Sequence, residues 1–174
     1  LIIAGNETMS GAAYFSAKSA LRMGSGLVKV ISCEANRPIL QSMLPEVLFG
    51  TYEDVKDALE WCDCILFGPG MGVSERTKEL LEEVLQRGTK PLLLDADGLN
   101  TVSRYGVEIS YPAGCVLTPH LLEAARLLGI SAEQVKETLA DAGQRLSDRV
   151  GGTAVLKDAA TLVVSGDQPV YYNS

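Results

Sequence analysis

Short apolar runs alternate along this chain with segments in which apolar residues recur at helical spacing. The runs predict strands at residues 1–4, 27–31, 47–49, 62–67, 92–94, 115–117, 153–156, 161–164 and 170–172. The segments between them predict helices at residues 10–23, 35–43, 52–61 and 131–150, and a further helix that begins after Ser74. Strands and helices that alternate in this way are typical of a mostly parallel sheet covered by helices.

Capping and turn residues mark the ends of several predicted elements. Ser10 and Ser74 are suited to cap the N-termini of their helices, and Gly88 stands where the residue after a helix end is expected. Between the last two strand runs, Ser165-Gly166-Asp167-Gln168 is a hairpin signal. We therefore expect one α/β domain over residues 1–174, with a β-hairpin region at its C-terminal end.

Composition excludes several classes of function. The 174 residues carry 15 basic and 22 acidic side chains, a net charge of −7, which argues against a protein that coats nucleic-acid phosphates. The longest apolar runs are about six residues, whereas a membrane span needs ~20, and no cationic, apolar leader opens the chain. These features predict a soluble, cytoplasmic protein that binds neither nucleic acid nor membrane.

The four cysteines do not form a metal or redox motif. One residue separates Cys62 from Cys64, where a zinc or redox pair has two, and no second pair follows. Alternation would place both thiols on one face of the strand at 62–67, so we expect them to be buried. No metal site is predicted.

Unusual segments follow several strands, at the carboxyl edge where open α/β sheets bind ligands. Gly68-Pro69-Gly70-Met71-Gly72 lies between a strand and a helix, where glycines let backbone N–H groups approach a ligand and a helix N-terminus favours anions. A tight turn without a ligand explains the same residues. Asp95 follows the next strand and is suited to order a ligand hydroxyl, a metal or a base, whereas Asp97 could simply cap a helix.

The only histidine also follows a strand. His120 comes after Thr118-Pro119 and is either a structural residue or a ligand contact, while Glu123 is suited to hold the start of a helix. Lys157 lies between two short strands, where a lysine and backbone amides could hold a nucleotide phosphate or could form a charged hairpin tip. The small residues Ser10-Gly11-Ala12-Ala13 leave room for a ligand or for close helix packing.

Familiar nucleotide and hydrolase motifs are missing from the sequence. It contains neither a Gly-x4-Gly-Lys-Ser/Thr loop nor a Gly-x-Gly-x-x-Gly segment after a strand, which excludes the usual P-loop and Rossmann sites. No nucleophile elbow accompanies the histidine, which excludes a hydrolase triad of that type.

Six segments in order resemble one family, the ADP/ATP-dependent NAD(P)H-hydrate dehydratases. They are Ser-Gly-Ala-Ala-Tyr, Ala-Leu-Arg-Met-Gly-Ser-Gly-Leu-Val-Lys-Val, Gly-Pro-Gly-Met-Gly, Leu-Asp-Ala-Asp-Gly-Leu-Asn, Leu-Thr-Pro-His and Val-Leu-Lys-Asp-Ala-Ala-Thr. The resemblance covers essentially the whole chain. It implies a ribokinase-like, three-layer α/β/α fold with a mostly parallel central sheet.

The resemblance also implies a reaction and its ligands. Such enzymes restore NADH or NADPH from its hydrate, NAD(P)HX, at the expense of ADP or ATP with Mg²⁺. By motif match, Ala13, Gly70 and His120 would contact the hydrated dinucleotide, with Asp95 and Asn100 as supporting residues. The adenine nucleotide would lie against Lys157, Asp158, Ala159, Ala160 and Thr161. A homo-oligomer and a fused or partner NAD(P)HX epimerase are compatible with this family.

Three departures from the family pattern affect these expectations. Relatives continue past a segment like Tyr171-Tyr172-Asn173 into Gly-Ser-Gly-Asp, whose aspartate is the catalytic base. The resemblance therefore implies a domain that is incomplete at both ends, with its catalytic aspartate beyond Ser174. Leu121 and Leu122 follow the histidine where many relatives have Pro-Gly. Asp158 replaces a common glycine and brings a negative charge beside Lys157.

Two alternatives remain at this point. A small-molecule kinase of the same fold, of the hydroxymethylpyrimidine or hydroxyethylthiazole type, would share the sheet but release a stable phosphorylated alcohol. A non-catalytic nucleotide-binding module would bind ADP tightly without turning over hydrated NADH.

Overall fold

The computed structural model describes residues 1–87, 89–107 and 110–173. Two sequence predictions fall outside the described residues: the helix-end role of Gly88, and Ser174 as the residue after which the catalytic aspartate is expected. The described strands form one sheet in the order β3-β2-β1-β4-β5-β6-β7-β8-β9. They are β1 (Ile2–Ile3), β2 (Lys29–Ile31), β3 (Leu48–Gly50), β4 (Ile65–Phe67), β5 (Leu92–Leu94), β6 (Val116–Leu117), β7 (Thr153–Leu156), β8 (Thr161–Ser165) and β9 (Tyr171–Asn173).

Neighbouring strands from β3 to β7 are parallel, and β8 and β9 are added in antiparallel fashion. The turn between β8 and β9 is closed by the Gln168 N–H, which donates to the Ser165 carbonyl at 3.1 Å. The predicted α/β class, with a mostly parallel sheet and C-terminal hairpins, is therefore confirmed.

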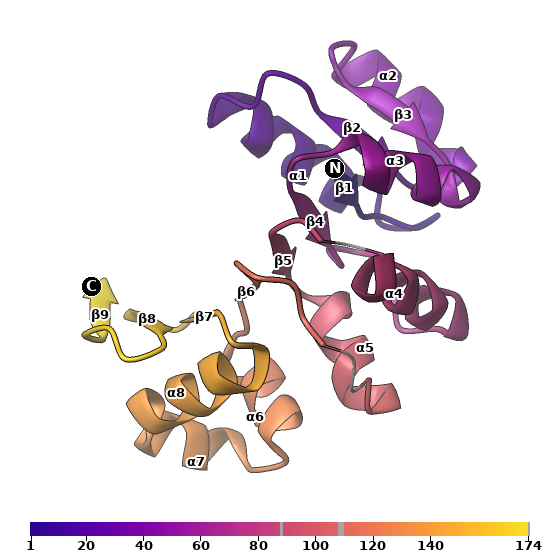
Figure 1. The fold of residues 1–174 in the computed structure, drawn as a ribbon. Helices are drawn as coiled ribbons and strands as arrows, with labels where there is room; N and C mark the ends of the chain where they lie inside the picture. The colour runs from indigo at the N-terminus through magenta and orange to yellow at the C-terminus, as the bar shows by residue number, and fades with distance from the viewer. Residues whose placement is uncertain (88, 108–109, 174) are drawn as a thin grey trace.

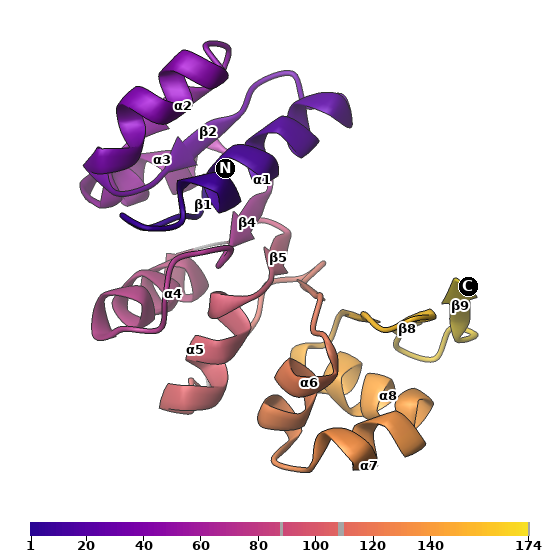
Figure 2. The ribbon, with the colours of Figure 1, turned by 180° about the vertical axis from the view of Figure 1, so that it is seen from behind.

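Helices pack on both faces of the sheet (Figures 1 and 2). The α-helices are α1 (Ser10–Arg22), α2 (Arg37–Met43), α3 (Val55–Trp61), α4 (Glu75–Arg87), α5 (Asp97–Tyr105), α6 (Leu121–Leu128), α7 (Ala132–Glu137) and α8 (Leu139–Val150), with 3₁₀ turns at Glu34–Asn36 and Tyr52–Asp54. Helices α1 and α2 share one core cluster with β1 to β3, and α3 to α8 share the other with β4 to β8. The layers are thus helix, sheet and helix.

Alternation along the central strands sends side chains to both faces. In β4, Ile65 and Phe67 are buried against the α3 to α8 layer, whereas Leu66 points to the opposite face and is only partly buried. Leu93 of β5 pairs with Leu66 and is also partly buried. One face of these strands packs in the core, and on the other face Leu66 and Leu93 line an apolar cavity.

Two predicted helices differ from the structure. The helix expected over 131–150 is split at Thr138, whose backbone leaves the helical region with φ −128° and ψ 43°. The Thr138 hydroxyl donates to the Gln134 carbonyl at 2.8 Å, so a local side-chain bond helps to end α7. Ser10 is the first residue of α1 rather than its cap, which is Met9 without a side-chain bond.

The expectation that both Cys62 and Cys64 are buried is wrong for Cys64. Strand β4 begins only at Ile65, and Cys62 is the C-cap residue of α3, so the two thiols do not alternate along one strand. Cys62 is buried and Cys64 is exposed.

Burial changes the acidity and the accessibility of the Cys115 thiol. Loss of solvent raises the pKa of its thiol from 9.0 to about 12. Because the folded protein holds this thiol proton more tightly than the unfolded chain, ionisation of Cys115 favours unfolding. Its contribution to the free energy of unfolding is therefore fully present below pH 9 and is lost as the pH rises from 9 towards 12. At pH 8 we expect iodoacetamide to modify exposed Cys64 and to leave Cys115 unmodified until the protein unfolds. Peptide mass spectrometry checks this; equal modification of both cysteines in the folded protein would contradict the burial of Cys115.

Among the described residues, no helix is both long and apolar enough to cross a membrane.

Candidate functional site

The carboxyl ends of β5, β6 and β7 bring three polar side chains together. Asp95 follows β5, Thr118 follows β6 and Lys157 follows β7. One carboxylate oxygen of Asp95, Oδ1, accepts hydrogen bonds from the Thr118 hydroxyl and from the Lys157 ammonium, each at 2.7 Å. The side chains of Asp95 and Lys157 are 26% and 44% exposed, so the ion pair lies at the surface where a ligand can reach it.

His120 lies directly beside Lys157. The two residues form an isolated parallel β-bridge, and the Lys157 N–H donates to the Pro119 carbonyl at 2.8 Å. Two residues predicted to serve different ligands, one for the hydrated dinucleotide and one for the nucleotide phosphates, are therefore neighbours across adjacent strand ends.

The imidazole of His120 also has a structural role. Its Nδ1 accepts from the backbone N–H groups of Leu122 and Glu123, at 3.1 and 3.4 Å, and so caps helix α6. Glu123, which is buried, accepts from the His120 N–H at 3.0 Å and completes a capping box, as expected of a residue that holds a helix start. Because Nδ1 accepts, neutral His120 carries its proton on Nε2, which lies 3.5 Å from Oε1 of Glu123 on a side chain that is 47% exposed.

The glycine-rich loop after β4 is held against the start of α5. Gly68 has φ +122°, and a Cβ there would lie 2.1 Å from the Asp95 carbonyl oxygen. The Gly98 N–H donates to that same carbonyl at 3.0 Å, and the Asp97 carboxylate accepts from the Gly72 N–H at 2.8 Å. Asp97 is the first residue of α5, whose N-cap is Ala96, so the expectation that it caps the helix is wrong; its carboxylate ties the loop to α5.

Ala96 has an unusual backbone in this turn. Its φ of 50° makes it the one non-glycine residue of the described chain with a positive φ. Such strain in an L-residue costs on the order of 1–3 kcal/mol and persists where surrounding contacts determine the conformation. Here the contacts are those of Asp95 and Gly98 on either side, so the strained turn fixes where the Asp95 carboxylate points.

Ala13 and Gly70 lie further along the same edge, near the carboxyl ends of β1 and β4, and both are buried. Ala13 packs beneath the chain at Gly5, after β1, and a Cβ on Gly70 would meet the Cβ of Ala12 at 2.6 Å. The small residues at the start of α1 therefore let the glycine-rich loop approach the helix closely. This arrangement favours a positioning role for both residues over a side-chain contact.

The other predicted residues fall into two places. Asp158 and Ala159 are exposed, and Ala160 and Thr161 half-buried, in the loop from Lys157 to β8, where their backbone can meet a ligand. Lys157 pairs with Asp95 across the site rather than with adjacent Asp158. Asn100 does not join this cluster: it accepts from Arg126 at 2.8 Å, in a groove between α5 and α6.

The catalytic base stays a prediction. The resemblance places it in a Gly-Ser-Gly-Asp segment beyond Ser174, whereas the structure describes the C-terminal part of the chain as far as Asn173. Asp95 is a carboxylate at the site, but its Oδ1 already accepts two hydrogen bonds. We therefore assign no described residue as the base.

Sequence reasoning missed Thr118 as a site residue, although it belongs to the Leu-Thr-Pro-His segment. A strand-end threonine next to a proline does not reveal which carboxylate it will contact, because Asp95 is 23 residues away in the sequence. The order of the strands in the sheet was the missing information.

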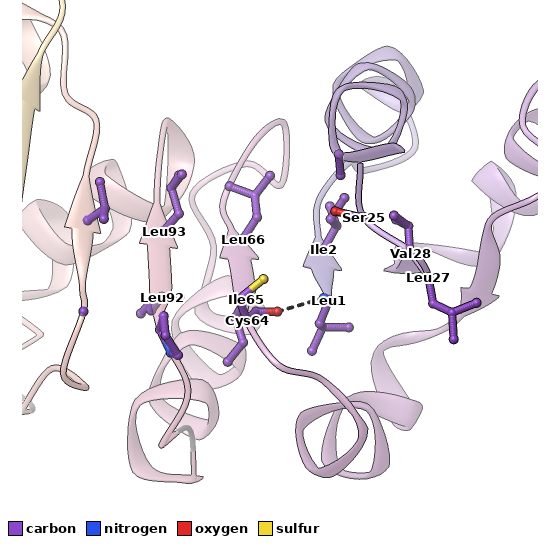
Figure 3. A pocket seen from close by; sticks show the side chains of 14 residues that line it. Leu1, Ile2, Ser25, Leu27, Val28, Cys64, Ile65, Leu66, Leu92 and Leu93 are labelled. Carbon is purple, nitrogen blue, oxygen red and sulfur yellow. Dashed lines mark hydrogen bonds between the residues drawn. The ribbon is translucent and has the colours of Figure 1, made fainter. Parts of the chain in front are cut away.

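An apolar cavity lies at the opposite ends of the strands. Figure 3 shows it beside the starts of β1, β4 and β5. Its volume is about 300 Å³. None of its lining side chains carries a charge: Leu1, Ile2, Ala20, Ser25, Leu27, Val28, Cys64, Ile65, Leu66, Pro91, Leu92, Leu93, Gly114 and Val116. Phosphate-bearing ligands therefore fit the carboxyl edge better than this cavity.

Metal-ligating side chains are sparse at the site. Within residues 1–87, 89–107 and 110–173, no three His, Cys, Asp or Glu side chains come together as a metal site. A divalent cation here would need ligand phosphates to complete its coordination, as Mg²⁺ commonly does.

Comparison with known proteins gives a consistent result. The chain is 37% identical over 167 residues to the bifunctional NAD(P)H-hydrate repair enzyme of Escherichia coli K12, with 95% of this chain and 32% of the relative covered. It is 34% identical over 172 residues to the ADP-dependent (S)-NAD(P)H-hydrate dehydratase of Listeria monocytogenes, with 96% and 60% covered. The chain thus spans about a third of the first relative and three fifths of the second.

A solved structure agrees with the topology. A ribokinase-like superfamily protein from Enterococcus faecalis superimposes with a TM-score of 0.90 and 30% identity, covering 99% of this chain and 61% of that one. The predicted ribokinase-like fold is therefore confirmed. The model of the family described as NAD(P)H-hydrate dehydratase matches residues 1–174. This chain belongs to the NAD(P)H-hydrate dehydratase family.

Proposed function

We propose that the protein containing this chain converts hydrated NADH or NADPH back to NADH or NADPH while ADP, or ATP in its place, is cleaved. The single observation that carries the proposal is the contact between the Lys157 and His120 strand ends. A phosphoryl group can pass between two ligands only if their reacting groups are adjacent. The family resemblance assigns the nucleotide to Lys157 and the hydrated substrate to His120.

The reaction needs a phosphoryl transfer because hydroxide is a poor leaving group. The ring hydroxyl of the hydrate would attack the terminal phosphorus of ADP and lose its proton; the bond to AMP breaks as the new phosphate ester forms. The ring C–O bond then breaks, phosphate leaves, and loss of a ring proton restores the double bond. One of the two protons goes to the phosphate and the other is released, so NADH, AMP, hydrogen phosphate and one proton account for all atoms of the hydrate and ADP.

The described residues would contribute charge and position to this sequence. The Lys157 ammonium, at the start of the loop that leads to β8, is suited to a phosphate oxygen. The Nε2–H of His120 is a donor for a polar group of the dinucleotide, while Ala13 and Gly70 would shape the floor of its pocket. Bound Mg²⁺ would neutralise phosphate charge, and the ligand phosphates would complete its coordination.

The assembly of the whole protein is also a proposal. The Escherichia coli relative is named a bifunctional repair enzyme, which supports a second, epimerase activity fused to this domain or supplied by a partner. We propose that residues 1–174 are one structural unit of that protein, compatible with a homo-oligomer.

The test of the proposed function is a product assay on the full-length protein. With hydrated NADH, ADP and Mg²⁺, we expect the nicotinamide absorbance to return, with one AMP and one phosphate released for each NADH restored. If neither ADP nor ATP supports recovery of NADH, the proposal is wrong. A stable phosphorylated alcohol without a dehydrated product would instead identify a kinase.

A further inference from the structure

The Asp95 carboxylate is an unexpected neighbour for a lysine that is to bind phosphate. Its Oδ1 lies 2.7 Å from the Lys157 ammonium, so the cation is already paired in the protein alone. An anion at this position also repels the phosphates of a nucleotide. The arrangement therefore needs a reason other than affinity for the nucleotide.

Hydrogen bonds fix both the backbone and the side chain of Asp95. The Thr118 hydroxyl donates to the same Oδ1 at 2.7 Å, which fixes the carboxylate from the next strand. The Asp95 carbonyl accepts from Gly98 at 3.0 Å, and the Asp95 N–H donates to the Phe67 carbonyl at 3.1 Å. Backbone and side chain are thus both immobilised, while the lysine they hold has a long, flexible stem.

We propose that Asp95, fixed by Thr118, is a positioning residue that holds the Lys157 ammonium beside His120, and that Lys157 in turn masks the Asp95 charge from the nucleotide. This inference rests on the proposed function, in which Lys157 meets a phosphate. It assigns Asp95 neither to the substrate hydroxyl nor to the nucleotide. Its role is exerted through Lys157.

If Lys157 masks the Asp95 charge, a second substitution at Asp95 should restore part of the ADP affinity lost in Lys157→Ala. Lys157→Ala removes a phosphate contact and also exposes the Asp95 charge, so ADP should bind about ten- to a hundredfold more weakly. Adding Asp95→Asn to that variant should restore ADP affinity by up to about fivefold, since a partly exposed charge is worth up to about 1 kcal/mol. Asp95→Asn alone removes the hold on Lys157 and the negative charge together, so the double variant, and not this single one, measures the repulsion.

If Asp95 holds Lys157 in place, loss of Asp95 should make the Lys157 ammonium more accessible. Reductive methylation followed by peptide mass spectrometry measures how accessible each ammonium is. We expect Asp95→Asn and Thr118→Val to raise the methylation rate of Lys157 severalfold, while exposed Lys136 serves as the internal reference. Thr118→Ser keeps the hydroxyl and should behave as the wild type, which separates loss of the hydrogen bond from a change of size.

Both measurements use the full-length protein and neither needs turnover. If the double variant binds ADP as weakly as Lys157→Ala or more weakly, Asp95 does not repel the nucleotide and the proposal is overturned. Unchanged methylation of Lys157 in Asp95→Asn would overturn it equally. A wild type that binds ADP but does not restore NADH would refute the proposed function alone, because the ADP cycle would still decide the role of Asp95.

Discussion

Replacing Gly68 by alanine is expected to lower the free energy of unfolding by at least about 3 kcal/mol, a large share of the roughly 5–15 kcal/mol typical of a folded domain. Two effects combine. The backbone φ of +122° is unfavourable for any L-side chain, and the new Cβ would lie 2.1 Å from the Asp95 carbonyl oxygen and 2.6 Å from the Gly98 nitrogen. Neither backbone atom can move without breaking the turn that holds Asp95.

Gly129→Ala is the matched control. Gly129 also has a positive φ, +68°, but nothing lies within 4 Å of an added Cβ. This variant isolates the conformational cost, which is about 1–2 kcal/mol. Chemical denaturation of both variants measures the difference. Equal destabilisation of the two would show that Gly68 and Asp95 are not in close contact, and the packing described for the site would then be wrong.

The second large effect separates the two ligands. Lys157→Ala should weaken ADP binding by about ten- to a hundredfold, because it removes a charge-assisted contact worth roughly 1.5–3 kcal/mol. The KM for hydrated NADH should change little. Substitution of His120 should do the reverse, weakening binding or turnover of hydrated NADH while ADP affinity stays nearly constant.

The choice of substitution at His120 follows from its role as the N-cap of α6. Alanine would remove both the ligand contact and the cap of α6, at a cost of about 0.5–2 kcal/mol in stability. His120→Asn keeps a residue that can cap the helix but removes the imidazole, so it is the better variant. Calorimetric titration with ADP and steady-state kinetics in hydrated NADH separate the effects. If both positions alter ADP affinity equally, or if neither alters anything, the division of the site is wrong and His120 is only a helix cap.

Much of this architecture could be predicted from local pattern. Apolar runs such as 92–94 lie in the interior of a parallel sheet, and their period and flanking residues predict strands without knowledge of the fold. The hairpin at Ser165–Gln168 could be predicted because its turn residues act locally. The break in the helix expected over 131–150 could not be predicted from sequence, since the apolar spacing continues through Thr138, where the backbone leaves the helical region and the hydroxyl donates to the Gln134 carbonyl.

Contacts between residues far apart in the sequence account for the features of the site that could not be predicted. Asp95 and Lys157 are 62 residues apart, and nothing in either segment predicts that they pair. The pair depends on β5, β6 and β7 lying side by side, which is a property of the whole sheet. The same reasoning applies to Asn100, whose neighbouring sequence places it near Asp97 but whose side chain contacts Arg126 on a different helix.

A crystal structure of the full-length protein with ADP and the product NADH tests the central claim most directly. We predict that the ADP phosphates lie against Lys157 and the backbone of the 158–161 segment. The nicotinamide ring should lie beside His120, near the start of α1 and the glycine-rich loop, close enough to the terminal phosphate for transfer. Phosphates bound in the groove lined by Arg104 and Arg126, or a nicotinamide ring remote from His120, would contradict the account.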